Sequence, residues 1–378
     1  MKKLKIGIIG AGWMGTTHAR AYNNIQQHYG TAVVPELEII VDAFEAQAQK
    51  VCEQYGFNRW STQPDDAISD PDIDVIVITT PNKFHVELVE KAAAAGKAVF
   101  CEKPLGMDGA DAKKALDAVR KNHTTSMVGF IYTHNPMVVQ ARELIQSGKL
   151  GKVVSFHGQY DMEYSAAPSI PHRWRDYDAI SGALGDIGAH MLALSDFVVG
   201  SKITEVCGKS STVFTERPSA DDPSKMLPVG NDDIFNVIYT YENGALGNLV
   251  TSRVAPGNKV GERFEVQCTK GAVRFDQERM NELEVYYHTD APDDQGFKLI
   301  RGMPEHGEYG VFCTQAGLGI SYIDLMTIQA HKFLTAVAEG KTVKPDIESG
   351  FEVNVLIDAM LKSDQEHRWV KVSECEPM

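Results

Sequence analysis

The stretch KIGIIGAGWMG, residues 5–15, decides the fold. It begins with a short apolar run and ends in a glycine-rich turn, which leads into a helical pattern at residues 16–25. A G-x-G-x-x-G pattern between a strand and a helix is typical of a dinucleotide-binding βαβ unit. The first glycine permits a tight turn, the second lets the backbone approach a pyrophosphate, and the third allows close helix packing. These glycines are Gly10, Gly12 and Gly15.

The same alternation of apolar runs and helical patterns continues along the first third of the chain. It predicts parallel strands joined by crossover helices. The expected strands are residues 5–9, 37–42, 74–80, 98–102 and 126–130, and the expected helices are residues 16–25, 46–55, 83–95 and 109–121. We therefore expect residues 1–128 to form a doubly wound parallel sheet of the Rossmann type.

The pattern changes after about residue 129. Long alternating runs, separated by Gly, Asn, Asp and Pro, predict one large and mostly antiparallel sheet. The runs are residues 153–161, 233–242, 245–255, 263–268, 272–276 and 283–288, and helical patterns follow at 323–338 and 351–362. The stretch TERPSADDPSKMLP, residues 215–228, is expected to be a mobile surface loop. The overall prediction is an α/β chain whose second domain, residues 129–378, is α+β.

Length and composition limit the possible partners. The 378 residues, 43% of them hydrophobic, are enough for two cores. A formal charge of -14 disfavours nucleic acid and anionic membranes and favours a small-molecule substrate. No apolar run approaches the roughly 18 residues of a membrane span, and the start of the chain passes directly into the glycine turn, so we expect a cytoplasmic protein. Six scattered cysteines without a C-x-x-C pair predict free thiols and no metal site.

Asp42 ends the second predicted strand and indicates which dinucleotide binds. A carboxylate there accepts hydrogen bonds from the adenosine ribose and repels a 2′-phosphate, so we expect NAD rather than NADP. The separation from Gly15 is longer than usual because QQHYGTAVVP is inserted. A solvated aspartate in a strand-end turn is the alternative interpretation.

The segment VFCEKPLG, residues 99–106, places Lys103 at the C-terminal end of a predicted parallel strand. Open α/β sheets bind ligands at this edge. Pro104 removes a backbone donor and favours an extended Lys103, whose ammonium can then hydrogen-bond a substrate oxygen. Taken alone, the tripeptide Glu-Lys-Pro carries little information and favours a solvated lysine before a turn proline.

Asp186 and His190 lie four residues apart in SGALGDIGAHMLALSDF, so a helix would present them on one side. A histidine of near-neutral pKa can accept a hydroxyl proton while hydride leaves the carbon, and the carboxylate can orient the substrate or the imidazole. We then expect the oxidation rate to rise with pH through a transition near neutrality. A core histidine bonded to its helical neighbour is the alternative, and metal binding is disfavoured because no third ligand follows.

Three segments together carry a resemblance. GAGWMG at residues 10–15, TTPNKFHVELVEKAAAAGKAVFCEKPLG at 79–106, and GALGDIGAH at 182–190, followed by Asp196, resemble the Gfo/Idh/MocA oxidoreductase family over almost the whole chain. The family includes inositol dehydrogenases and glucose-fructose oxidoreductase. The resemblance implies a Rossmann domain, a second domain whose open sheet makes oligomer contacts, and an active site between them.

The resemblance also assigns roles. It implies that Lys103 is the catalytic lysine, Asp186 the substrate-positioning aspartate and His190 the catalytic histidine. The residues implied to line the cofactor, beside the glycines and Asp42, are Trp13, Met14, Thr80, Pro81, Asn82, His85, Glu102 and Lys103. Four of them, Pro81, Asn82, His85 and Glu102, could equally be structural residues at a strand end or on a helix face. The run PHRWRDYD resembles the segment that borders the substrate, with Trp174 and Arg175, although a loop tryptophan can equally anchor its loop. Thr133 and His134 stand where the family often has an arginine, so the sugar selectivity tied to that arginine is not carried over.

These expectations converge on NAD-dependent oxidation of a secondary hydroxyl of a sugar or cyclic polyol. We expect a homodimer or homotetramer, because a broad open sheet needs its outer face or edges covered. Two alternatives stay open: an NAD-assisted glycoside-cleaving enzyme, and a non-catalytic ligand-sensing regulator on the same fold.

Overall fold

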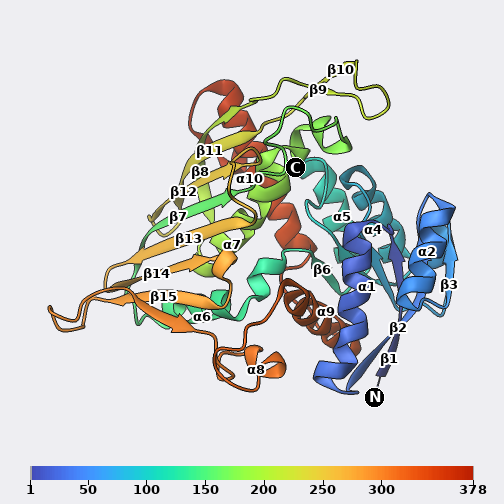
Figure 1. Ribbon diagram of the computed structural model, residues 1–378, viewed down its shortest axis with the longest axis horizontal. Helices are drawn as coiled ribbons and strands as arrows, with labels where there is room; N and C mark the ends of the chain where they lie inside the picture. Colours follow the sequence, from blue (N-terminus) through green and yellow to red (C-terminus); the bar gives the residue numbers. More distant parts are fainter. Residues whose placement is uncertain (1, 378) are drawn as a thin grey trace.

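The computed structural model describes residues 2–377, and its N-terminal part is built on a six-stranded parallel sheet (Figure 1). The strand order is β3-β2-β1-β4-β5-β6, so the order reverses between β1 and β4, where dinucleotides bind in such sheets. The strands are β1 (Lys2–Ile9), β2 (Val33–Val41), β3 (Arg59–Ser61), β4 (Val75–Ile78), β5 (Ala98–Cys101) and β6 (Ser126–Val128). The predicted doubly wound sheet is confirmed.

Helices cover both faces of this sheet, which is why the strands β4 and β5 are apolar and buried throughout. The helices are α1 (Trp13–Tyr29), α2 (Glu45–Tyr55), α3 (Asp65–Ile68), η1 (Asn82–Phe84), α4 (His85–Ala94) and α5 (Gly109–Lys121). Two helices from the end of the chain complete the cover: α9 (Tyr322–Glu339) packs on α1, and α10 (Ile347–Glu366) packs on α5. The domain division at residue 128 stays a prediction.

The second sheet has nine strands in the order β16-β15-β14-β13-β7-β12-β11-β8-β17. All neighbours are antiparallel except β7 and β12, which confirms the expected large and mostly antiparallel sheet. The strands are β7 (Val153–Asp161), β8 (Ile203–Ser211), β11 (Ile234–Tyr241), β12 (Leu246–Ser252), β13 (Gly261–Cys268), β14 (Gly271–Asp276), β15 (Glu282–Tyr287), β16 (Lys298–Arg301) and β17 (Val370–Lys371).

Helices cover one face of the second sheet, and the other face is exposed (Figure 1). The helices α6 (Pro136–Gln146), α7 (Ala189–Val199) and α10 pack on the covered face. Short helical turns complete the chain at η2 (Ile131–His134), η3 (Trp174–Asp176), η4 (Ala179–Ser181), η5 (Leu184–Gly188), η6 (Gln277–Arg279), α8 (Tyr309–Phe312) and η7 (Val372–Glu374). Within residues 2–377, no helix combines the length and the apolar character needed to cross a membrane.

The expectation of a mobile loop at residues 215–228 was wrong at both ends of the segment. Its ends pair as a hairpin of β9 (Glu216–Pro218) and β10 (Met226–Pro228). Arg217 in β9 is fully buried, and its guanidinium donates to the backbone of residues 165 and 167. Arg217 therefore anchors this segment to the loop at residues 165–167.

Candidate active site

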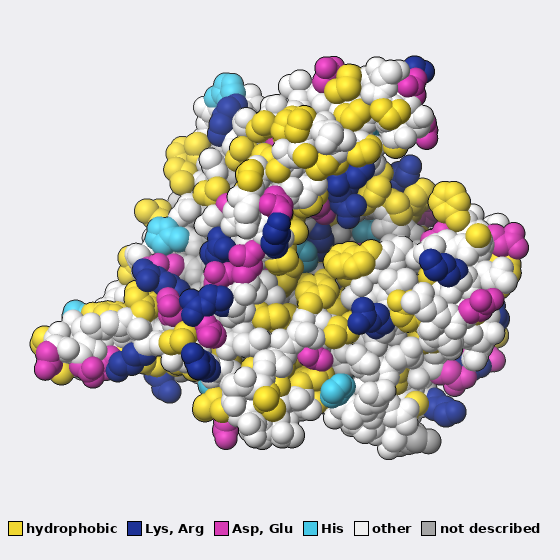
Figure 2. All heavy atoms as spheres, in the orientation of Figure 1, with side chains coloured by type: hydrophobic (Ala, Val, Ile, Leu, Met, Phe, Trp, Pro, Cys, Tyr) yellow, Lys and Arg dark blue, Asp and Glu magenta, His cyan; other side chains and the backbone are white. Residues whose placement is uncertain are grey.

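A cavity of about 1540 Å³ lies between the two halves of the molecule. The surface is hollowed there, with apolar side chains around the opening (Figure 2). All the site residues expected from the sequence line this cavity except Gly15. They are Gly10, Gly12, Trp13, Met14, Asp42, Thr80, Pro81, Asn82, His85, Glu102, Lys103, Trp174, Arg175, Asp186 and His190.

The glycine turn between β1 and α1 is shaped to admit a phosphate group. Gly10 has a φ of +105°, and a Cβ there would lie 2.7 Å from the carbonyl oxygen of Thr79. A Cβ on Gly15 would lie 2.0 Å from the carbonyl oxygen of Gly10. Gly12 instead has no atom within 4 Å of its Cβ position, so the backbone is accessible from the cavity. With the free N–H groups of the first turn of α1, this cradle fits a pyrophosphate.

Asp42 follows β2 directly and binds the glycine turn. One carboxylate oxygen accepts from the backbone N–H of Ala11 at 2.8 Å, and the other accepts from Phe44 N–H at 2.9 Å. Each oxygen keeps a further lone pair, which suits hydrogen bonds from ribose hydroxyls. The ring of Phe44 is 75% exposed on the cavity wall, where an adenine can stack. These features fit NAD.

Two of the expected cofactor-lining side chains have their polar atoms bonded within the protein. The ring nitrogens of His85 lie 2.9 Å from the carbonyl oxygen of Pro104 and 2.8 Å from that of Thr80. Glu102 Oε1 lies 2.8 Å from Nε2 of the buried His18. His85 and Glu102 therefore hold together the loops that border the cavity.

Asp186 is the point where the two halves of the site meet. Lys103 Nζ donates to the Asp186 carbonyl oxygen and, at 3.1 Å, to its Oδ1. The hydroxyl of Tyr164 donates to Oδ2 at 2.7 Å, and Arg175 Nε lies 3.2 Å from the same oxygen. Burial alone would raise the pKa of Asp186, but the charges of Lys103 and Arg175 and the bond from Tyr164 hold it well below its usual value. Asp186 is therefore a carboxylate.

The backbone around Asp186 is a π-helical turn, η5, which continues into α7. A Cβ at Gly185 would lie 1.8 Å from the carbonyl oxygen of Ile180, so only glycine fits this turn. The expectation that Asp186 and His190 lie on one regular helix is corrected, since they belong to consecutive π and α segments. Such π turns are frequent at functional sites.

His190 faces the cavity from α7 and is enclosed by aromatic rings. Its ring lies edge-to-face on Tyr132, with centroids 4.9 Å apart, and Phe130 is 6.2 Å away. Burial, and then the charge of Lys103, lower the pKa of His190 well below its usual value. The imidazole is therefore neutral at neutral pH, so its titration is expected below neutrality rather than near it.

Sequence reasoning missed several residues that line the cavity from the second half. They are Tyr132, Tyr160, Met162, Tyr164 and Arg173. The hydroxyls of Tyr132 and Tyr160 lie 2.9 Å apart. The only signal in the sequence was the position of residues 160–164 at the end of a predicted strand. Among the described residues, no three His, Cys, Asp or Glu side chains are grouped so that they could hold a metal ion.

Comparisons with known proteins agree with this geometry. Residues 4–130 match the family described as an oxidoreductase family with an NAD-binding Rossmann fold. Residues 138–274 match the GFO/IDH/MocA C-terminal domain. Together the two matches span more than half of the chain.

The similarity extends over nearly the whole chain in individual relatives. A levoglucosan dehydrogenase of Pseudarthrobacter phenanthrenivorans is 35% identical over 99% of this chain and 99% of that relative. An inositol 2-dehydrogenase of Rhizobium meliloti is 27% identical over 98% of this chain and 99% of the relative. A solved levoglucosan dehydrogenase in complex with NADH and L-sorbose superimposes with a TM-score of 0.95 at 35% identity, covering 98% of this chain and 99% of that one. The chain belongs to the Gfo/Idh/MocA family of NAD-binding oxidoreductases.

Proposed function

We propose that the protein is a dehydrogenase that oxidises a secondary hydroxyl of a sugar or cyclic polyol with NAD. The observation that carries the proposal is the meeting of Lys103, Asp186 and His190 in the cavity that also contains the glycine turn. Bound NAD would accept the hydride at its nicotinamide C4. A dehydrogenase needs in addition a proton acceptor and a group that stabilises the developing alkoxide.

The side chains divide these tasks. The substrate hydroxyl lies between Lys103 and His190, and the neutral imidazole of His190 accepts its proton. The ammonium of Lys103 donates a hydrogen bond to the oxygen and stabilises its negative charge. Asp186 fixes Lys103 through the 3.1 Å contact and positions the carbinol. The low pKa of Asp186 prevents it from competing with His190 for the proton.

The walls of the substrate end favour a compact sugar ring. Trp174, Met162 and Tyr132 provide apolar surface for one face of a ring, and Arg175 provides donors for hydroxyl groups. The guanidinium of Arg175 lies 4.2 Å from the ring centroid of Trp174, which keeps both at the rim of the cavity. The greater identity to the levoglucosan dehydrogenase than to the inositol dehydrogenase favours an anhydrosugar as the first substrate to test.

A substrate screen tests the proposal. Levoglucosan, other anhydrosugars, aldoses and inositols are each incubated with NAD or NADP while NADH or NADPH absorbance is recorded. We expect NADH formation with at least one compound, and none with the same compound in the variant His190→Asn. Consumption of a glycoside without net NADH would instead indicate NAD-assisted cleavage, and ligand binding without any turnover would indicate a sensor.

We also propose that the protein assembles as a homodimer or homotetramer through the outer face of the second sheet. The strands β11 and β12 expose Ile238, Leu246 and Val250 on this face. Neighbouring exposed apolar side chains on a sheet are typical of an association surface.

A further inference from the structure

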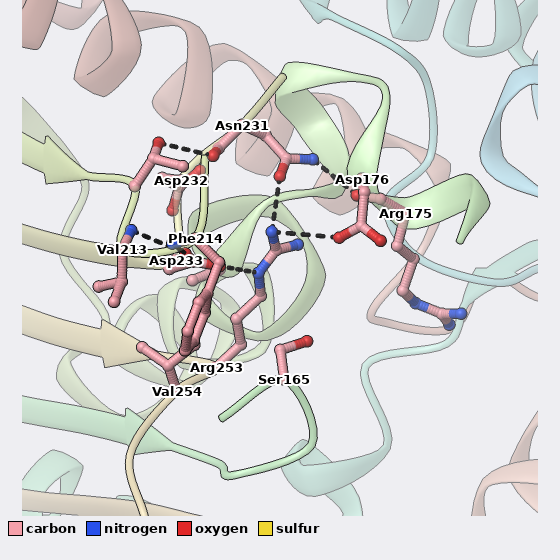
Figure 3. A network of polar contacts seen from close by, with 12 residues as sticks. Ser165, Arg175, Asp176, Val213, Phe214, Asn231, Asp232, Asp233, Arg253 and Val254 are labelled. Carbon is pink, nitrogen blue, oxygen red and sulfur yellow. Dashed lines mark hydrogen bonds and ion pairs between the residues drawn. The ribbon is translucent and has the colours of Figure 1, made fainter. Parts of the chain in front are cut away.

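The tripeptide Asn231-Asp232-Asp233 connects the two segments that carry Arg175 and Asp186, although none of its residues lines the cavity. Figure 3 shows the tripeptide with Arg175, Asp176 and Arg253. Asn231 reaches the first segment. Its Nδ2 donates to the carbonyl oxygen of Arg175 at 2.6 Å and to that of Asp178 at 2.8 Å. Asn231 therefore contributes two hydrogen bonds that hold η3, the turn that carries Arg175.

Asp232 holds the second segment. Its Oδ2 accepts from the backbone N–H of Leu184 at 2.9 Å, and its carbonyl oxygen accepts from Ala183 N–H at 3.0 Å. A Cβ on Gly182 would lie 2.0 Å from Asp232 Oδ1, so the chain approaches the carboxylate as closely as glycine allows. These contacts fix the start of η5, the π turn that carries Asp186.

Arg253 locks the tripeptide in place. Its guanidinium donates to Asp233 Oδ1 at 2.8 Å and to Asn231 Oδ1 at 2.8 Å, and it lies 3.3 Å from Asp176 Oδ1. The side chains of Arg253, Asp176 and Asp233 are fully buried. Buried charges that lose a partner are costly, so the cluster tolerates little displacement of the segments attached to it.

We propose that Asn231, Asp232 and Arg253 are positioning residues, which hold Arg175 and Asp186 in the contact that shapes the substrate end of the cavity. Both ends of that 3.2 Å contact are fastened to the tripeptide. Hydride transfer depends on small differences in the orientation of the reactants, so loosening either end changes the reaction. The inference rests on the proposed function and adds residues outside the cavity to its machinery.

The hydrogen bonds of Asn231 (the Asn231 arm) and those of Asp232 (the Asp232 arm) predict different kinetic effects. Loss of the Asn231 arm frees Arg175, which contacts the substrate in the proposed function, so it raises KM. Loss of the Asp232 arm displaces Asp186 and the lysine bonded to it, so it lowers kcat. The cradle for NAD lies on the other half of the molecule and should keep its affinity.

Paired variants test this division. Asn231→Asp keeps the oxygen that accepts from Arg253 but loses both donations and sets an oxygen against two carbonyl oxygens, so we expect KM to rise at least about tenfold. Asp232→Ala should lower kcat about tenfold, while Asp232→Asn keeps an acceptor for Leu184 and should restore kcat to within about threefold. Ser363→Ala, which removes a buried hydroxyl bonded to Gly208 and Arg368 in the same half, is the matched control.

Hydrogen exchange of residues 173–188, measured by mass spectrometry without substrate, separates this inference from the proposed function. We expect faster exchange there in Asn231→Asp and Asp232→Ala, and wild-type exchange in Ser363→Ala. Wild-type exchange in the two test variants, or a parallel loss of NAD affinity and substrate affinity, would overturn the positioning role. If the wild type oxidises no sugar or polyol, the proposed function fails, and the exchange measurement still decides whether the tripeptide holds the segment.

Discussion

Burial and single charged side chains together determine the protonation states in this site, and among the side chains Lys103 has the largest influence. Its charge favours the ionised form of Asp186 and the neutral form of His190. The sequence pointed to all three residues through the joint resemblance of three segments, because the local patterns of Lys103 and His190 alone left structural alternatives open. Tyr164 escaped notice, since its significance arises only from its 2.7 Å contact with Asp186 across the fold. A tyrosine shortly after a strand carries no such signal by itself.

The first prediction concerns the proton acceptor. Replacing His190 with Asn should lower turnover by roughly two to four decades, the loss typical of a positioned acid-base group, while NAD affinity stays within about twofold. Initial rates and calorimetric titration with NAD measure the two quantities. Near-normal turnover in the variant would remove His190 from the mechanism.

The second prediction concerns pH. Burial and the charge of Lys103 lower the pKa of His190, so the wild-type oxidation rate should rise with pH in the acidic range and be flat above about pH 6.5, the ordinary pKa of histidine. Replacing Lys103 with Met removes a positive charge that favours the neutral ring, so the pKa of His190 should increase. An NMR titration of the imidazole measures this in both proteins. An unchanged or lower pKa in Lys103→Met would contradict the electrostatic coupling.

The third prediction concerns the choice of cofactor. Asp42 has two roles to separate: its charge repels a 2′-phosphate, and its oxygen supports the glycine turn. Asp42→Asn removes the negative charge but keeps an acceptor for the Ala11 N–H, so it tests the first role alone. We expect the ratio of kcat/KM for NADP to that for NAD to rise about tenfold. Asp42→Ala, which also loses the bond to Ala11, serves as the comparison. A ratio unchanged in both variants would assign Asp42 a structural role only.

Among the helices and strands, those with a regular apolar period were predictable and those fixed by distant contacts were not. The alternation in β11 and β12 was recognised from the sequence. The strand β8 was missed because its sequence, ITEVCGKSS, has few apolar side chains on the buried face. Gly208 lies on that face, and the ring of Phe235 fills the space that a side chain there would occupy. The π turn of η5 was likewise invisible, because its glycine is required by a close approach to Ile180.

The fourth prediction concerns Glu262 in β13, opposite Tyr160 in β7. It is fully buried, and neither carboxyl oxygen has a hydrogen-bond partner among residues 2–377. Burial raises the pKa of Glu262 well above 4.5, so the folded protein retains a proton that the unfolded chain has released above that pH. The wild-type free energy of unfolding should therefore fall as pH rises above 4.5, by up to about 1.4 kcal/mol per pH unit.

Glu262→Gln cannot ionise and lacks this contribution. The variant should gain stability over the wild type progressively from pH 5 to pH 8, with little difference at pH 5. Urea unfolding at several pH values measures the effect, with the exposed Glu90→Gln as control. A difference between Glu262→Gln and wild type that is constant with pH would show that Glu262 titrates normally.

The molecule as a whole joins its two halves by more than the chain connection at residue 129. The helix α10 packs on both α5 of the first half and β8 of the second, and α9 covers α1. Near the cavity, Trp13 of the glycine turn stacks on Tyr322 at the start of α9, with centroids 6.2 Å apart. Sequence periodicity predicted the existence of α9 and α10 but could not show that they cover the first sheet. That placement depends on which surfaces remain open after both sheets have formed.

The last prediction concerns assembly. The outer face of the second sheet exposes Ile238, Leu246 and Val250, with exposed fractions of 52%, 60% and 37%, on the adjacent strands β11 and β12. An open sheet with exposed apolar side chains is stabilised when a second copy covers it. Light scattering should therefore give a mass two or four times the 41.6 kDa of the chain. The double variant Ile238→Glu and Val250→Glu places charges in the contact, and it should shift the mass toward 41.6 kDa without loss of helical signal. As a control, Met303→Glu replaces an exposed residue outside this sheet and should leave the mass unchanged. A wild type that scatters as a monomer at micromolar concentration would show that the outer face is not an association surface.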